Sequence, residues 1–287
     1  MKAQKFDLKS VKTINEVLEQ TQMNWIADQH ELLTGSGISI HSHKALLRSD
    51  NNAELGIVGK GYEPVQNATA FAFIDVLSTN KQATYEYLYS INNGSRMIIQ
   101  AKTNNSFSVR KGDDIDGYIT MMNSFDGSTP FKVFFTPIRL FCKNQLLAAI
   151  RHATQMVSIR HTKTVMDKAE EAMKILGLAK EYFDNFQVVA KQLADKAITS
   201  RMVDNFLKEV LGDCNNARRV TQHEEVKNLV SVGKGNNGSS VWDLYNGVTE
   251  YVDHHRGNDE SKRMANSLIG SGSIIKMNAW NAAVKLI

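Results

Sequence analysis

The chain has 287 residues, of which 42% are hydrophobic and three are proline, and its formal net charge at pH 7 is +4. This composition excludes a tail or linker protein and predicts one large domain, or two closely packed ones, with a sizeable core. The first twenty residues lack the apolar segment of a signal peptide, and no later stretch is apolar for long enough to cross a bilayer. We therefore expect a cytoplasmic protein without membrane contacts.

The N-terminal half predicts an α+β core preceded by an extension. Residues 1–54 mix short amphipathic pieces with a turn-rich loop, and we expect little regular structure there. A strand and turn are predicted at 55–66, and a helix at 67–80. Two antiparallel hairpins follow, one turning at Asn93-Gly94 after a strand with alternating aromatic residues, the other at Asp126-Gly127. The core, 55–163, is expected to hold these hairpins as a sheet with packed helices.

The C-terminal region, 164–287, is predicted to be mostly α-helical, with no convincing strand after Leu140. Small or apolar residues recur at spacings of four and three between 164 and 197, which is the heptad pattern of one long helix. An unbroken helix of that length would be roughly 50 Å long at 1.5 Å per residue. Its seam would pack within the chain or between subunits, and we assign Phe183, Phe186 and Leu193 to this oligomer or helix interface. Further helices are predicted at 200–211, 222–232, 240–255 and 274–286.

The glycine-rich loop 233–240, with the sequence GKGNNGSS, invites comparison with phosphate-binding loops. Glycines let backbone N–H groups approach an anion, and a helix N-terminus favours negative charge. The spacing G-x-x-x-x-G-K-[ST] is absent, however, and the loop does not follow a predicted strand, which argues against nucleotide hydrolysis. We expect an exposed loop, or one that contacts a nucleic-acid phosphate, with Ser239 or Ser240 as the N-cap of the next helix.

Cysteine, histidine and acidic residues form no recognisable metal-binding pattern. Cys142 and Cys214 are far apart and neither has a C-x-x-C partner, so both are expected to be reduced. The other candidates are His41 and His43, the run Asp253-His254-His255, and the cluster Asp113, Asp114 and Asp116. Surface histidines and a solvated turn are the simpler interpretations, because adjacent helix residues point in different directions. We expect no metal, cofactor or catalytic group, and a metal-dependent nuclease built on the acidic cluster stays an alternative.

The distribution of charge is more informative than its net value. Between Gly127 and Met166 the sequence contains no Asp or Glu. A basic strand that continues into a basic helix face would form a track for a phosphate backbone, and Phe134 or Phe141 would stack on bases if exposed. The predicted nucleic-acid contacts are Lys132, Arg139, Lys143, Arg151, Arg160, His161 and Lys163. Charges that only solvate a surface are the alternative explanation.

Several separate motifs occur in the order of a known family. They are LGIVGKGYEPVQN, FFTPIRLFCKNQL, SIRHT, SSVWDLYNGVTEYVDHHRG and LIGSGS. Through this combination, over about residues 55–286, the chain resembles the phage/plasmid-like proteins of the family of domain of unknown function 932. The corresponding positions are Thr136, Pro137, Arg139, Cys142, Asn144, Arg160, His161, Trp242, Asn246 and Gly270. The resemblance implies a mobile genetic element in a bacterial host cell, but no particular reaction.

The order of elements is more distantly similar to the core of phage single-strand annealing proteins of the Red-beta, RecT and Erf group. Those proteins form rings or filaments on single strands and need no nucleotide or metal. This likeness of fold implies a homo-oligomeric protein that binds single-stranded DNA and anneals complementary strands in recombination. A phage anti-defence factor, or another protein that binds a host or phage protein through its long helices, is the alternative.

Overall fold

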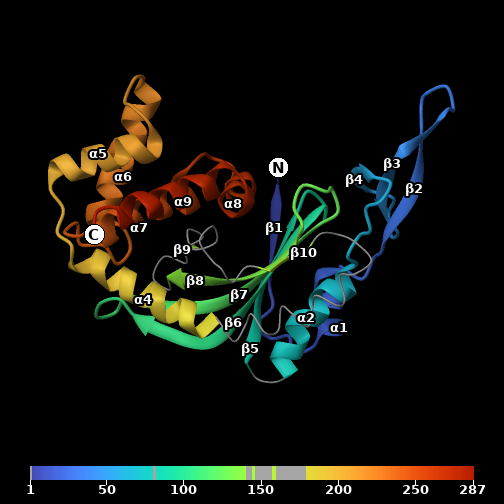
Figure 1. The fold of residues 1–287 in the computed structure, drawn as a ribbon, viewed down its shortest axis with the longest axis horizontal. Helices are drawn as coiled ribbons and strands as arrows, with labels where there is room; N and C mark the ends of the chain where they lie inside the picture. The colour runs from blue at the N-terminus through green and yellow to red at the C-terminus, as the bar shows by residue number, and fades with distance from the viewer. Residues whose placement is uncertain (1, 80–81, 140–143, 146–156, 160–178) are drawn as a thin grey trace. The chain divides into compact units, whose positions relative to one another are not determined.

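The structure is a computed structural model that describes residues 2–79, 82–139, 144–145, 157–159 and 179–287 (Figure 1). It confirms the predicted α+β class, because strands dominate the N-terminal half and helices the C-terminal half. The described residues fall into two compact units. The first unit contains 2–79, 82–104, 118–135 and 157–159, and the second contains 105–117, 136–139, 144–145 and 179–287. The boundary expected at residue 163 lies outside the described residues.

The larger sheet has the strand order β1-β5-β6-β7-β8-β10, and β9 pairs with β8. The first predicted hairpin joins β5 to β6 with Tyr89 opposite Ile98, and its turn places Asn92 and Asn93 at φ angles of 48° and 58°, which asparagine tolerates. The strands are β1 (Ala3–Asp7), β5 (Ala83–Ile91), β6 (Arg96–Ser108), β7 (Asp114–Ser124), β8 (Phe131–Arg139), β9 (Asn144–Gln145) and β10 (Val157–Ile159).

The strands β9 and β10 correct the expectation that no strand follows Leu140. Val157 of β10 lies opposite Val133 of β8, and Gln145 of β9 lies opposite Ile138 of the same strand. Both strands are two or three residues long, so neither contains enough residues to produce a recognisable alternation of apolar and polar side chains. They exist because β8 offers backbone partners.

The core of the first unit forms where two helices pack near β5. Helix α2 (Asn67–Thr79) contacts β5, and α1 (Ile14–Thr21) contacts α2. Phe71 and Ile74 are three residues apart on α2 and both are fully buried, because this spacing places them on one helix face. The strand β1, the helix α1 and the strands that follow it show that the expectation of little regular structure in residues 1–54 was wrong.

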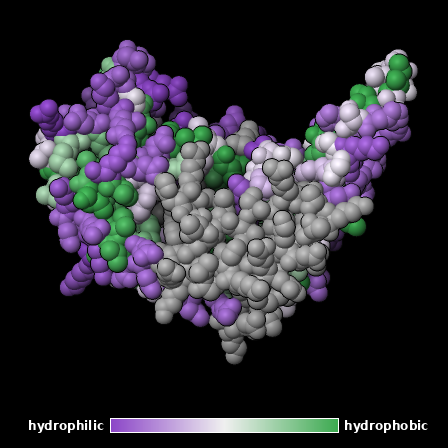
Figure 2. Space-filling view, viewed as in Figure 1, coloured by the Kyte–Doolittle hydropathy of each residue, from purple (hydrophilic) through white to green (hydrophobic). Residues whose placement is uncertain are grey.

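A smaller sheet of order β2-β3-β4 follows α1, with strands Ala27–Leu33, Ser39–Arg48 and Glu54–Gly59. Most side chains of β2 and β3 are exposed on both faces of their hairpin. Leu33 and Ile38, which flank the hairpin turn, are 57% and 66% exposed. Figure 2 accordingly shows hydrophobic atoms at the tip of this hairpin. The hairpin therefore carries apolar side chains that the first unit does not cover.

The helices of the second unit pack around α7, whose ten residues are all buried. Helices α4, α6 and α9 all contact α7, and Figure 1 shows α7 and α9 lying close together. The predicted helix at 240–255 is α7 followed by one π-helical turn, η2, in which the N–H of Arg256 donates to the carbonyl of Tyr251. The helices are α4 (Ala179–Asp195), α5 (Ser200–Leu211), α6 (Ala217–Val232), α7 (Val241–Glu250), η2 (Tyr251–His255), α8 (Glu260–Ile269) and α9 (Ser271–Val284).

Sequence reasoning missed α8 and placed the start of α6 five residues too late. Helix α5 has the predicted bounds, and its N-cap Thr199 accepts a hydrogen bond from the N–H of Met202. Within the part of the chain that the structure describes, no helix combines the length and the apolar character that crossing a membrane requires.

Phe183, Phe186 and Leu193 lie on the buried face of α4. The described part of this helix begins at Ala179. The Phe186 ring stacks on Trp280 of α9, with centroids 5.0 Å apart and planes 16° apart. Phe183 meets Phe107 of β6 edge-on at 5.0 Å. These aromatic contacts lie within the second unit, where they join α4 to α9 and to the end of β6. Residues 164–178 of the predicted long helix lie outside the described residues.

Replacing Phe186 with alanine should lower the free energy of unfolding by about 3–5 kcal/mol, because it removes a buried ring and leaves a cavity beside Trp280. The matched control is Val188→Ala on the same helix, where the side chain is 56% exposed and the loss should stay within about 0.5 kcal/mol. Urea unfolding followed by tryptophan fluorescence measures both. Equal losses for the two variants would contradict the assigned face of α4.

Candidate functional site

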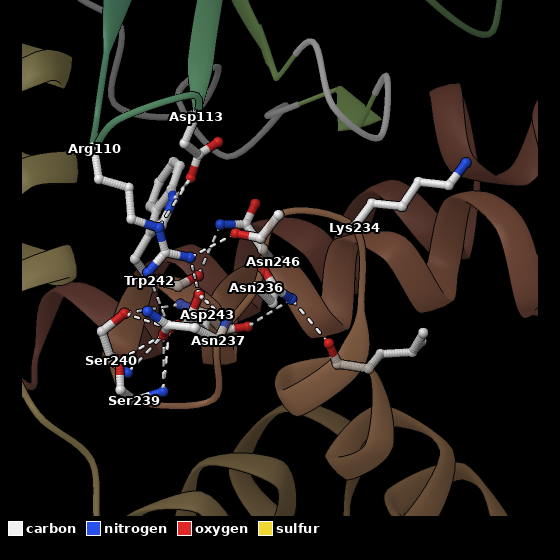
Figure 3. Close-up of polar contacts among 12 residues, drawn as sticks. Arg110, Asp113, Lys234, Asn236, Asn237, Ser239, Ser240, Trp242, Asp243 and Asn246 are labelled. Carbon is white, nitrogen blue, oxygen red and sulfur yellow. Dashed lines mark hydrogen bonds and ion pairs between the residues drawn. The ribbon is translucent and has the colours of Figure 1, made fainter.

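The carboxylate of Asp243 organises the start of α7 (Figure 3). Asp243 is fully buried, and its oxygens accept hydrogen bonds from the Ser240 hydroxyl at 2.8 Å and from the Ser240 N–H at 3.1 Å. The N–H groups of Asn237 and Ser239 add bonds of 3.3 and 3.2 Å. Ser240 in turn accepts from the N–H of Asp243, so the two residues form a capping box. The capped helix start and the preceding loop therefore share one buried negative charge.

Arg110 supplies the opposite charge from the turn between β6 and β7. Its guanidinium donates to both carboxylate oxygens of Asp243 and, at 2.6 Å, to the carbonyl of Gly235. Burial alone would raise the pKa of Asp243, but hydrogen bonds from Arg110 and Ser240 and the charge of Arg110 outweigh burial and hold this pKa below its ordinary value. Asp243 is therefore ionised at neutral pH.

Asp113 makes a second link between the same turn and α7. The Trp242 indole Nε1 donates to Asp113 Oδ2 at 2.9 Å, and Arg110 Nε lies 3.7 Å from the same oxygen. Asp113 and Asp116 are 2% and 3% exposed, so the solvated-turn interpretation of the acidic cluster was wrong for these two residues. Nothing in the sequence near Asp113 indicates that its carboxylate accepts a hydrogen bond from a tryptophan of a distant helix.

The loop 233–240 holds an internal carboxylate rather than offering its N–H groups outward. The donors of Asn237, Ser239 and Ser240 point to Asp243, and the N–H of Lys234 donates to Glu250 at 3.0 Å. Figure 3 shows the Lys234 side chain directed away from Asp243. The glycine-rich loop therefore uses the chemistry of anion binding to fix its own helix.

A buried lysine joins η2, α8 and α9. Lys276 is fully buried, and its Nζ donates to Asp253 Oδ1 at 2.8 Å and to Ser267 Oγ at 2.9 Å. Burial lowers the pKa of Lys276, and the charge of Asp253 partly opposes that shift. Gly272 permits the close packing, because a Cβ there would lie 2.9 Å from both the Asn266 carbonyl and the Val252 side chain. The three segments are thereby held together beside a pocket.

This pocket, which we call the cationic pocket, has a volume of about 240 Å³. Its walls come from the first turn of α6, from Val252 of η2 and the loop after η2, from α8, and from the start of α9. Four of the lining side chains are cationic and one is acidic. The lining residues are Arg218, Val252, Arg256, Gly257, Asn258, Asp259, Lys262, Arg263, Asn266 and Ser271.

Two of these arginines are held in place by single contacts. Arg256 Nη1 donates to Ser271 Oγ at 3.0 Å, and Arg263 Nη1 donates to the Gly257 carbonyl at 2.7 Å. Each guanidinium has five N–H groups, so most of its hydrogen-bonding capacity is not used by these contacts. Arg218 is exposed at the start of α6. The pocket can therefore bind an anion through several charge-assisted hydrogen bonds.

Of the seven residues predicted to contact nucleic-acid phosphates, Lys132 and Arg139 lie in the described part of the chain. Lys132 is half-buried in the first unit, and Arg139 ends β8 in the second. Phe134 is only 2% exposed, so its ring is not available to stack on a base. The remaining predicted residues lie outside the described residues: Phe141, Lys143, Arg151, Arg160, His161 and Lys163.

The cationic pocket escaped sequence reasoning because its charges are dispersed. Arg218 lies 38 positions before Arg256, and acidic residues follow in Asp259 and Glu260, so no run of one sign marks the site. The motif DHHRG was the sequence feature that could have indicated the pocket, because its last two residues, Arg256 and Gly257, line the wall. Among the described residues, no three His, Cys, Asp or Glu side chains gather as a metal site would require. His255 lies 3.5 Å from Glu225.

The substitution Asp243→Asn should lower the free energy of unfolding by about 3 kcal/mol near pH 7, because it removes the carboxylate that accepts hydrogen bonds from Arg110 and leaves this partly buried guanidinium with the more distant Asp113, 3.7 Å away, as its counter-charge. A carboxylate with a depressed pKa stabilises the fold above its unfolded-state pKa of about 3.9, and this stabilisation is lost as pH falls through the folded-state pKa. The difference between wild type and variant should therefore shrink below about pH 4.

Urea unfolding at a series of pH values measures this difference. Asp213→Asn is the matched control, because Asp213 pairs with Lys208 on the surface, where both side chains are more than half exposed and such pairs contribute about 0–1 kcal/mol. A pH-independent difference for Asp243→Asn, or a loss no larger than that of the control, would contradict the assigned ion pair.

Comparison of the sequence with known protein families gives a match. The sequence profile described as Domain of unknown function (DUF932) matches residues 54–269. This span includes Arg110, Asp243 and the four cationic residues of the pocket. The comparisons with curated proteins and with solved structures gave no match. Because the profile match covers more than half of the 287-residue chain, the protein belongs to the DUF932 family.

Proposed function

We propose that the protein binds single-stranded DNA through phosphate groups and, as a homo-oligomer, anneals complementary strands in the recombination of a phage or plasmid. The observation that carries this proposal is the cationic pocket, where Arg218, Arg256, Lys262 and Arg263 surround one concave site. Arginine forks match the oxygen geometry of phosphate, and cationic contacts that release counterions supply most of the affinity of sequence-independent binding.

The composition of the pocket wall supports contact with the backbone rather than with bases. None of its ten lining residues is aromatic, so the site offers charge and hydrogen bonds without a stacking surface. A protein that holds phosphates leaves the base edges free to pair with a second strand. Annealing therefore needs no catalytic group, no nucleotide and no metal. The positive segment from Gly127 to Met166 would extend the phosphate track.

Binding to another protein is the second candidate, and the β2–β3 hairpin favours it. Leu33 and Ile38 expose more than half of their surface at the hairpin turn, where a partner would cover them. The two functions are compatible, because the hairpin belongs to the first unit and the cationic pocket to the second.

Wild-type protein should bind a single-stranded oligonucleotide of mixed sequence, with a logarithmic affinity that falls linearly with the logarithm of salt concentration. The variant Arg218→Gln/Lys262→Gln/Arg263→Gln should flatten that slope by about one to two units, at roughly 0.7 per lost single-strand contact. Fluorescence anisotropy across a salt series measures the slope. A fluorescence assay of complementary strands should show faster annealing with wild type than with the variant.

The matched control is Lys208→Gln/Lys227→Gln/Lys285→Gln, which removes the same charge from exposed ion pairs of the second unit. It should keep a slope close to that of wild type. A parallel variant, Arg139→Ala/Lys143→Ala/Arg151→Ala, tests the positive segment. Absence of binding by the wild type at low salt would refute the proposed function. Equal slopes for pocket and control variants would exclude the pocket.

A further inference from the structure

We propose that the cationic pocket receives the terminal phosphomonoester of a nucleic-acid strand rather than a phosphodiester within the strand. The inference rests on the proposed function and assigns a more specific ligand to the same site. Three properties of the pocket carry it: its small concave shape, its excess of positive charge, and its hydrogen-bond donors.

The small size of this concave pocket favours the end of a strand. The wall is contributed by four segments, namely the start of α6, the loop after η2, α8 and the start of α9. A volume of about 240 Å³ lies below the roughly 300–1,000 Å³ of typical ligand pockets, so it suits a phosphate group with part of a sugar. A phosphate inside a strand has chain leaving on two sides, which needs an open groove. A terminal phosphate enters from one side only.

The charge of the wall matches a dianion better than a monoanion. Arg218, Arg256, Lys262 and Arg263 face a single carboxylate, that of Asp259. Asp259 also caps α8 by accepting from the N–H of Lys262 at 3.0 Å, which directs part of its charge to the helix start. A phosphodiester carries one negative charge, whereas a phosphomonoester carries about −1.5 to −2 at pH 7. The additional charge is stabilised where four cations converge.

The hydrogen-bond donors of the pocket also favour a phosphomonoester, which has one terminal oxygen more than a phosphodiester. A monoester has three terminal oxygens, and the two anchored guanidiniums retain N–H groups for them beyond their contacts to Ser271 and Gly257. Ser271 lies in the wall at the first turn of α9, and no side chain caps that helix. Backbone N–H groups there add to the positive end of the site, although the four cations carry the argument.

The test compares three single-stranded oligonucleotides of the same sequence with an internal dye: one with a 5′-phosphate, one with a 3′-phosphate and one with hydroxyls at both ends. Wild type should bind at least one phosphorylated form about tenfold more tightly than the hydroxyl form, since hydrogen bonds to charged groups have that magnitude. In Arg218→Gln/Lys262→Gln the preference should fall to twofold or less. Lys262 Nζ forms an ion pair of 3.7 Å with Asp259 Oδ2, and both side chains are more than 40% exposed, so losing this contact should cost little and the variant should fold.

The control Lys208→Gln/Lys227→Gln removes equal charge outside the pocket and should keep the tenfold preference. Circular dichroism and the melting temperature check that both variants are folded. Free nucleoside monophosphate and inorganic phosphate serve as competitors, and each should displace the strand only at concentrations far above that of the phosphorylated oligonucleotide.

Binding without any end preference would overturn this inference and leave the proposed function standing. Binding of none of the three oligonucleotides at low salt would overturn both. Competition by nucleoside monophosphate or inorganic phosphate at concentrations equal to the oligonucleotide would show that the site takes a small free ligand, which also overturns the strand-end assignment. A preference that survives in the pocket variant would place the end-binding site elsewhere and overturn it too.

Discussion

The second unit depends on one buried negative charge and the way it is satisfied. Asp243 lies in the first turn of α7, the helix on which α4, α6 and α9 pack, and it receives hydrogen bonds from a serine, three backbone N–H groups and an arginine. A buried carboxylate without such partners would lose several kcal/mol of solvation. Because Arg110 comes from the β6–β7 turn, satisfying this charge also fixes that turn against the helices.

The same unit places positive charge in two different environments. Lys276 is buried with Asp253 and Ser267, and its ammonium group donates hydrogen bonds to both of them. Its charge therefore serves to hold three segments together. The arginines and the lysine of the cationic pocket lie at or near the surface, where the backbone that carries them is held in place by that internal contact. This division separates a structural cation from cations that are available to a ligand. It also explains why a chain with a net charge of only +4 can present a locally basic site.

Periodic patterns allowed much of the fold to be predicted from sequence. The bounds of α5 followed from its helical pattern, whereas the N-cap of α7 at Ser240 and the turn at Asn93-Gly94 followed from capping and turn chemistry, which act over a few residues. The short strands β9 and β10 did not, because two or three residues are too few to show an alternation of apolar and polar side chains. The site was harder still. Arg110 and Asp243 are 133 positions apart, and nothing local to either residue indicates the other.

Charge runs were a poor guide to the site for a related reason. The single-sign segment from Gly127 stands out in the sequence, whereas Arg256 sits between Asp253 and Asp259, and Arg218 lies 38 positions earlier and reaches the same pocket only after the helices pack. Buried aromatic residues gave a similar lesson. Phe134 alternates with basic residues in a way that suits base stacking, yet its ring is buried. Pattern predicts which face a side chain takes, but the packing of distant elements decides what lies against that face.

The π-helical turn η2 places one inserted residue beside the pocket wall. The bond from the Arg256 N–H to the Tyr251 carbonyl spans five residues instead of four, so this turn contains one residue more than an α-helical turn. The wider turn absorbs the inserted residue, so Arg256 keeps nearly the angular position that it would have four α-helical residues after Tyr251. Deleting one residue between 251 and 255 would therefore convert η2 into ordinary helix and leave Arg256 in the wall of the pocket. The segment can thus lose a residue without moving the cation, whereas a deletion in an α-helical segment rotates the residues that follow by about 100°.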